Sequence, residues 1–342
     1  AVSFLHVRNS HFGVPDILMT LLVSLAVWLC IIGQEKGWVL LGASFVAALA
    51  FTTKWTALPA ALPLALATVM CYNSGEVKAV RISKATIVTM VAAAFGLGLV
   101  IGFPQLFLKP NIYLAFMQAQ YASGEAGGFD IWQVDTVPGW VFYLKTIYTG
   151  LGSVMTVSSV LGLVGIVMSA LRERHIRFSI TLLLAFPVVY WVLMGSTRHY
   201  FVRYALPLVP FCAVFAAQGV DFLKEILSRW LKFDRSPWIL RGVVGVIVAV
   251  AAFSPLQSSL QFDHLLNQKD TRTLAREWIE VNIPSGSKIA IDWPIHGPPL
   301  CPKDKPVAPI PCSSHVYEVT TIGGVGCRNT TLLTIEHKDM SI

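Results

Sequence analysis

The chain reads Ser10-His11-Phe12-Gly13-Val14-Pro15-Asp16 at the point where it enters an apolar run over residues 17–33. A run of this length reaches the lower limit of about 17 residues for a helix that spans a membrane. A carboxylate at the mouth of such a span is costly unless it has a partner or a function. Pro15 suits the first turn of a helix and Asp16 complements the helix dipole. Asp16 therefore either caps a transmembrane helix or belongs to a functional site.

Composition identifies the class of protein. Of the 342 residues 55% are hydrophobic and only 13% are charged, and the mean hydropathy is +0.63. Soluble domains carry about 25% charged residues, so the chain is predicted to be an integral membrane protein. The net charge of +7 does not indicate nucleic-acid binding, because the basic residues cluster in short loops between apolar segments.

The apolar segments predict an all-α polytopic membrane bundle with about eight transmembrane helices. The segments cover residues 17–33, 38–53, 55–72, 86–104, 150–170, 178–195, 204–223 and 240–258. The second is marginal in length, and only Thr53-Lys54-Trp55 separates it from the third. Because the chain starts with Ala1 and has no leader, we expect it to be a fragment that lacks its N-terminal part.

Basic residues orient these spans. They concentrate in three connections, residues 73–85, 171–177 and 224–241, which the positive-inside rule places in the cytoplasm. Alternating spans then place residues 1–16, Lys54, the loop 105–149, residues 196–205 and the tail after residue 258 outside. The predicted location is the cytoplasmic (plasma) membrane, with a multi-pass region over residues 1–258 and an extracytoplasmic C-terminal domain over residues 259–342.

The two large outer segments differ in character. Loop 105–149 is rich in Gly and acidic residues, without periodicity, and is either a lid or ligand-binding segment or a solvated connector. Its end, from Trp140 to Tyr148, is aromatic and reads as an amphipathic helix on the membrane surface. In the tail, Thr271 to Asn282 predicts a helix and residues 288–292 a strand, which together indicate the start of a small α/β domain, cut short at Ile342.

The six cysteines form two groups. Those in apolar spans are predicted to be free thiols, namely Cys30, Cys71 and Cys212. The tail contains Cys301, Cys312 and Cys327, which allow one disulfide and one free thiol, with Cys301 and Cys312 the nearest pair.

No motif of a soluble enzyme is present, and the eight histidines lack the spacing of metal ligands, so we expect no metal and no cofactor. The unusual polar residues lie instead at the outer ends of the spans. They are Asp16, His11, Lys54, Arg198, His199 and Arg203. Each cation could merely extend its head group to the membrane interface. Together, cations at helix ends beside one carboxylate indicate an anion site, and at a membrane interface the obvious anion is a lipid phosphate.

The chain resembles the membrane glycosyltransferases of the GT-C class (family 39/83-like). Within that class it is similar to the branch of dolichyl-phosphate-mannose–protein mannosyltransferases and the lipid A aminoarabinose transferase. The resemblance covers most of residues 6–295. It rests on Arg8-Asn9-Ser10-His11-Phe12-Gly13-Val14-Pro15-Asp16, Phe51-Thr52-Thr53-Lys54-Trp55, Gly139-Trp140-Val141-Phe142-Tyr143-Leu144, Arg203-Tyr204-Ala205-Leu206-Pro207-Leu208-Val209-Pro210 and Thr271-Arg272-Thr273-Leu274-Ala275-Arg276-Glu277-Trp278-Ile279.

The resemblance implies transfer of a sugar from a polyprenyl-phosphate-linked donor to an acceptor outside the membrane; the acceptor is unknown and could be protein, lipid or glycan. It implies that Asp16 is the second acidic, catalytic position and that Lys54, Arg198 and Arg203 contact the donor phosphate. His11 and His199 are candidate substrate contacts. The general base of such enzymes lies in their first outer loop, which is expected upstream of Ala1.

The alternative function is that of a transporter, or of a membrane protein that binds a lipid carrier without catalysis. Transporters commonly show broken helices, polar residues at mid-span and internal repeats. The spans here have few charges at mid-depth and no visible repeat. A third interpretation is a structural multispan protein whose outer tail binds a partner.

Overall fold

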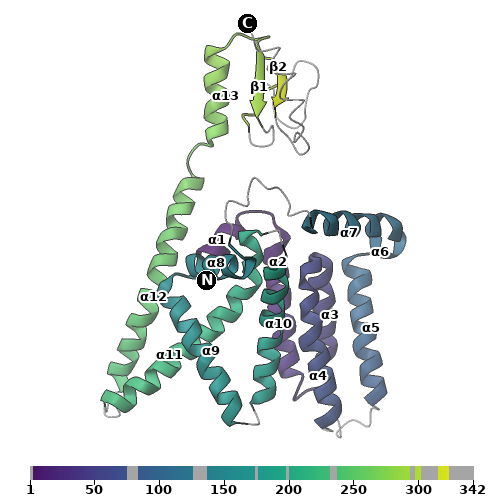
Figure 1. Cartoon of the computed structure of the whole chain (residues 1–342), viewed down its shortest axis with the longest axis vertical. Helices are drawn as coiled ribbons and strands as arrows, with labels where there is room; N and C mark the ends of the chain where they lie inside the picture. The colour runs from purple at the N-terminus through teal and green to yellow at the C-terminus, as the bar shows by residue number, and fades with distance from the viewer. Residues whose placement is uncertain are drawn as a thin grey trace. The chain divides into compact units, whose positions relative to one another are not determined.

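The computed structural model describes residues 3–74, 84–125, 137–173, 176–197, 200–231, 237–292, 297–301 and 315–322. Contacts divide the chain into two units, residues 1–260 and 261–342. The first is a bundle of helices, most of whose long members run side by side in Figure 1. In chain order the helices are α1 (Phe4–Ser10), α2 (Pro15–Ile32), α3 (Val39–Thr53), η1 (Trp55–Ala60), α4 (Ala61–Ser74), α5 (Lys84–Gly102), α6 (Gln105–Leu108), α7 (Pro110–Glu125), α8 (Gly139–Leu151), α9 (Ser153–Arg172), α10 (Arg177–Ser196), η4 (Val202–Leu208), α11 (Val209–Leu231) and α12 (Pro237–Leu266), which continues into the second unit.

The bundle is that of a multi-pass membrane protein. Among the described residues, six helical stretches are long and apolar enough to span a membrane. They are Pro15–Ile32, Ala85–Gly102, Ser153–Arg172, Arg177–Ser196, Val202–Ile226 and a stretch that begins at Arg241. The apolar helical stretches Val39–Thr53 and Trp55–Cys71 are shorter. The predicted helical membrane bundle is thus confirmed, whereas the number of eight spans stays a prediction.

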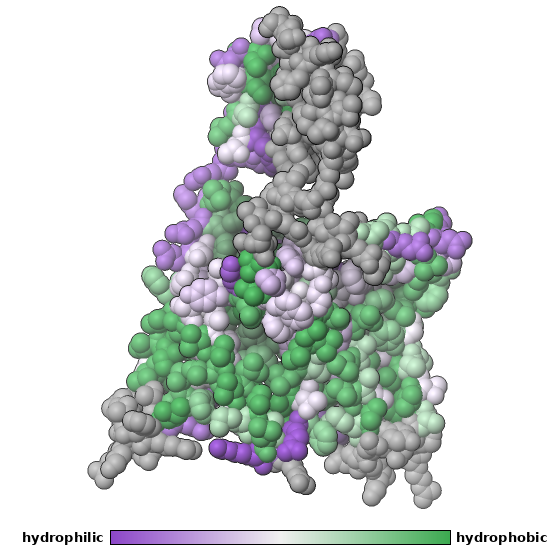
Figure 2. All heavy atoms as spheres, in the orientation of Figure 1, coloured by the Kyte–Doolittle hydropathy of each residue, from purple (hydrophilic) through white to green (hydrophobic). Residues whose placement is uncertain are grey.

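Hydrophobic side chains cover most of the visible flank of the helical unit (Figure 2). The exposed hydrophobic side chains of this unit include Leu97, Val164 and Phe253, each about half exposed or more. Soluble proteins rarely expose apolar surface on this scale, because water makes it unfavourable. A lipid surrounding accounts for it.

Small residues let the long helices pack closely. A Cβ atom added to Gly162 on α9 would lie 1.8 Å from the Phe215 carbonyl oxygen on α11, so the two backbones are in direct contact. The Ser159 hydroxyl donates a hydrogen bond of 2.8 Å to the Cys212 carbonyl across the same crossing. Close approach at glycines and hydroxyl bonds between helices are the usual means of association in lipid, where the hydrophobic effect does not hold helices together.

Segment 105–149 is more helical than the sequence predicts. Residues 105–108 and 110–125 form α6 and α7, which run crosswise beside the end of α5 in Figure 1, so the prediction of an aperiodic loop is wrong over this part. The segment's later acidic and glycine residues, Gly127, Gly128, Asp130 and Asp135, lie outside the described residues. The aromatic end forms α8 as predicted, and Tyr143, Ile147 and Leu151 on one face of α8 are buried in the bundle.

The second unit contains α13 (Thr271–Asn282), β1 (Lys288–Asp292) and β2 (Glu318–Ile322). The strands pair in parallel, with Lys288 opposite Glu318. The predicted helix and first strand are confirmed, and β2 was not predicted. Cys301 is disulfide-bonded. The predicted pairing with Cys312 lies outside the described residues, while Cys30, Cys71 and Cys212 form no disulfide, as expected.

Candidate functional site

Asp16 is buried at the start of α2. Its side chain is 1% exposed, because α2 packs against η4, α3 and η1 at this end of the bundle. The residue before the helix is Val14, and no side chain caps α2 through a hydrogen bond. The Asp16 carboxylate instead accepts a hydrogen bond from a side chain at the reversal between α3 and η1. Helix capping alone therefore does not account for this carboxylate.

That side chain is Lys54, whose Nζ lies 2.5 Å from Asp16 Oδ1. Lys54 is the one extended residue between α3 and η1, so the chain reverses at it and its side chain turns into the bundle. Only 14% of the side chain is exposed. Burial lowers the pKa of the Lys54 ammonium below its ordinary value of 10.5; the Asp16 carboxylate opposes this shift, and the nearby Arg203 adds to it.

Arg203 is the second cation, and it comes from η4. Its Nε lies 3.8 Å from Asp16 Oδ2, and its guanidinium lies 4.4 Å from the centre of the Phe201 ring. The Arg203 side chain is 39% exposed, so this cation is more accessible than Lys54. The predicted proximity of Asp16, Lys54 and Arg203 is confirmed, although 187 residues separate the first from the last.

Two tyrosines that sequence reasoning missed support the cluster. The Lys54 ammonium lies 3.9 Å from the centre of the Tyr204 ring, a cation–π contact. The Tyr190 hydroxyl on α10 donates a hydrogen bond of 3.0 Å to the Tyr204 carbonyl and so fixes the backbone of η4 beside Arg203. Tyr190 is fully buried. The Arg203-Tyr204 pair was visible in the sequence, but no local signal connected it to Tyr190.

A cavity of about 280 Å³ adjoins Lys54. Its wall is mostly aromatic and apolar, and it combines the end of α3 and start of η1 with α5, α6, α7 and η4. The lining residues are Phe51, Thr52, Thr53, Lys54, Trp55, Leu99, Phe103, Leu106, Tyr113, Phe116, Met117 and Tyr204. Lys54 is the sole charged residue among these described residues. Lys54 therefore contacts the buried carboxylate through its ammonium and also lines an apolar cavity.

The remaining predicted site residues are His11, Arg198 and His199. His11 is exposed in the turn after α1, and its Nδ1 bonds at 2.9 Å to the Val7 carbonyl of its own helix. Arg198 and His199 lie outside the described residues. Across the parts of the chain that are described, no group of three His, Cys, Asp or Glu side chains could hold a metal ion.

The arrangement can bind an anion. One buried and one half-exposed cation share a single carboxylate, so positive charge exceeds negative charge at the cluster and a second anion would be attracted there. The aromatic cavity would accommodate an apolar group attached to that anion. Comparison with models of known protein families, with curated protein sequences and with solved structures found no match.

Proposed function

We propose that the chain is part of a membrane glycosyltransferase that takes its sugar from a polyprenyl-phosphate-linked donor. The observation that carries the proposal is the position of Lys54, whose ammonium contacts the buried Asp16 and which also lines the aromatic cavity. A lipid phosphate has the two features that such a site selects, a charged head and an apolar chain. The resemblance of the surrounding sequence motifs to GT-C transferases supports the same ligand class.

Lys54 and Arg203 would bind the phosphate of the donor. Arg can hold two phosphate oxygens at once and Lys supplies a point charge. Arg203 is half-exposed, and its 3.8 Å contact with Asp16 is longer than that of Lys54, so it can turn to a ligand at a smaller cost. Asp16 acts mainly through Lys54, because its carboxylate is buried beneath that ammonium. It holds the lysine in place and neutralises it while the site is empty.

The reaction would be a single displacement at the anomeric carbon. The oxygen of an acceptor hydroxyl forms a bond to that carbon, the bond from the carbon to the phosphate oxygen breaks, and the hydroxyl proton passes to a base. The products are the glycosylated acceptor and the lipid phosphate. The phosphate leaves with the bonding electrons, and cations stabilise the charge that develops on it, which is why the site needs Lys and Arg rather than a proton donor.

The basic loops support a site that faces the outside of the membrane. Lys36 lies in the polar turn of residues 33–38. This turn follows the end of α2 that is remote from Asp16. The segments rich in Lys and Arg fall at alternate connections along the chain, as the positive-inside rule requires for this orientation. The sugar donor would then be used on the extracytoplasmic face, where the second unit would also lie.

Binding of a polyprenyl phosphate to the purified full-length protein tests the proposal, with the matching polyprenyl alcohol as the comparison. We expect wild-type protein to bind the phosphate more tightly than the alcohol. Lys54→Gln should remove most of that preference, roughly tenfold or more, because a hydrogen bond to a charged group is lost. Lys145→Gln is the matched control, since Lys145 is an exposed lysine on α8 and does not line the cavity.

Transfer assays separate the two candidate functions. A transferase should move labelled sugar from the donor lipid to membrane acceptors, and Arg203→Gln should slow this transfer. A carrier-binding protein would bind the phosphate through Lys54 but transfer no sugar. Equal binding of phosphate and alcohol by wild-type protein would contradict both.

A further inference from the structure

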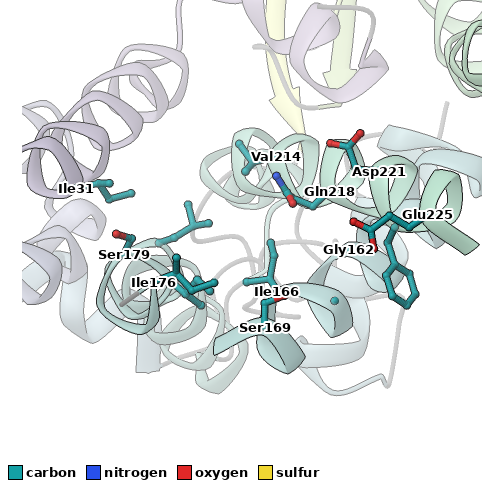
Figure 3. Close-up of a pocket in the computed structure, with 14 residues that line it drawn as sticks. Ile31, Gly162, Ile166, Ser169, Ile176, Ser179, Val214, Gln218, Asp221 and Glu225 are labelled. Atoms are coloured by element: carbon teal, nitrogen blue, oxygen red, sulfur yellow. The ribbon is translucent and has the colours of Figure 1, made fainter. Parts of the chain in front are cut away.

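A second and larger cavity lies at the other end of the bundle. Its volume is about 370 Å³, within the range of small-molecule pockets. It is bordered by the end of α2 and by α9, α10 and α11 (Figure 3). Ile31 at its edge is 15 residues along α2 from Asp16, which corresponds to roughly 22 Å of helix. The two cavities share no described lining residue.

One side of this cavity is apolar. Its floor includes glycines, which leave space above α9, and its apolar side chains are mainly isoleucines from three helices. The members of this side are Ile31, Gly162, Gly165, Ile166, Ile176, Ile180, Leu183, Val214 and Phe222. Such a surface would bind a hydrocarbon chain.

The other side is polar and acidic. Gln218, Asp221 and Glu225 follow one another at spacings of three and four residues, so they form a single face of α11, as Figure 3 shows. Ser169 on α9 adds a hydroxyl at the edge. Among the described residues that line the cavity, no side chain is basic.

These carboxylates stand near the end of a membrane span. Asp221 and Glu225 lie in the last six residues of the helical stretch Val202–Ile226, which is apolar enough to span the membrane, and both are exposed. A charged head group at the membrane surface can reach such a position while its apolar chain extends along the cavity. The cavity thus combines a hydrocarbon-binding wall with negative charge, which is complementary to a molecule that carries a cation on an apolar chain.

We propose that this cavity binds an amphiphile with a primary ammonium head group, the head on Asp221 and Glu225 and the chain along the isoleucines. The ammonium could belong to an aminophospholipid of the bilayer or to a freely diffusing hydrophobic amine. The site is independent of the sugar-transfer site, since it uses different residues at the opposite end of the bundle.

Binding of dodecylamine to the full-length protein in nanodiscs of phosphatidylcholine tests the proposal, with dodecanol as the uncharged comparison. We expect dodecylamine to bind and dodecanol to bind at least about tenfold more weakly, because a hydrogen bond between charged groups is absent. Asp221→Asn should reduce dodecylamine binding by a similar factor. Glu35→Gln is the matched control: it removes an exposed carboxylate that follows α2, near Ile31 in the sequence, but does not line the cavity.

A second variant tests the cavity itself. Gly165→Leu should block binding by filling the space. The fold should tolerate it because the atoms nearest to an added Cβ at Gly165 belong to the Phe222 side chain, at an ordinary 3.7 Å. Adding phosphatidylethanolamine to the nanodiscs distinguishes the sources. Loss of dodecylamine binding in nanodiscs that contain phosphatidylethanolamine identifies the bilayer lipid as the occupant. Unchanged dodecylamine binding in these nanodiscs identifies a free amine. Equal binding of amine and alcohol, or wild-type binding by Asp221→Asn, would overturn the proposal.

Discussion

Neutralising Asp16 should expose the energetic role of the buried ion pair. In Asp16→Asn the Lys54 ammonium keeps its buried position, with 14% of its side chain exposed, but loses the carboxylate that lies 2.5 Å away. Removing one partner of a buried pair costs about 3–5 kcal/mol of folding free energy. Arg203 adds little to this sum, because its 3.8 Å contact is partly screened by solvent. A loss of about 3 kcal/mol or more is therefore expected from the contact with Lys54 alone.

Reversible unfolding in mixed detergent micelles, followed by helical circular dichroism, measures this loss without any reference to activity. The decisive comparison is Asp16→Asn with the double variant Asp16→Asn/Lys54→Met. Because the double variant buries no unpaired charge, it should recover much of the stability, and the coupling between the two changes should reach roughly 1–3 kcal/mol. Glu35→Gln, at an exposed carboxylate, should leave the unfolding free energy unchanged. A loss below about 1 kcal/mol in Asp16→Asn, together with additive effects in the double variant, would refute the buried pair.

Three further predictions follow from the helical unit. Gly162→Ala should destabilise the bundle, since the new Cβ would lie 1.8 Å from a carbonyl oxygen of α11. Gly242→Ala should not, because a Cβ added there has no neighbouring atom within 4 Å; thermal unfolding measures the stability of both variants. Because burial lowers the pKa of Lys54, its ammonium loses its proton at a lower pH than an ordinary lysine as the pH rises. Binding of a polyprenyl phosphate to wild-type protein should therefore weaken with rising pH before pH 10.5 is reached, whereas Lys54→Arg, which keeps its charge, should retain binding; a titration of binding against pH checks this. In intact cells a cysteine at Ser10 should react with an impermeant thiol reagent and one at Lys36 should not; reversed labelling would contradict the orientation.

The spans and the charged members of the site could be predicted from sequence for the same reason. An apolar run is a local signal, and a charge at its end is conspicuous because lipid makes it costly. Asp16, Lys54 and Arg203 each stand at a predicted span end, so their common side of the membrane followed from alternation of the spans. Their contact did not follow, because it depends on the rotation and packing of three helices. Only the structure supplies the distances of 2.5 and 3.8 Å.

The aromatic surroundings of Lys54 could not be predicted. An aromatic residue in a membrane helix can face lipid or protein equally well, so the sequence does not separate Tyr190, which is buried, from its exposed neighbours. Helix α7 was missed for a related reason. Tyr113 and Met117 face the cavity while Ile112 and Leu114 are exposed, so apolar residues occupy several sides of the helix and leave no clear polar stripe to detect.

The buried ion pair also constrains how the chain is made. Lys54 follows Asp16 by 38 residues, and ribosomes add about 5–20 residues per second, so the partner emerges roughly two to eight seconds after the carboxylate. During that interval α2 must enter the bilayer with Asp16 uncompensated at its mouth. The hairpin of α2 and α3, ending at Lys54, is therefore the smallest unit in which the Asp16 carboxylate has its partner. Arg203 joins much later, when most of the helices are already in place.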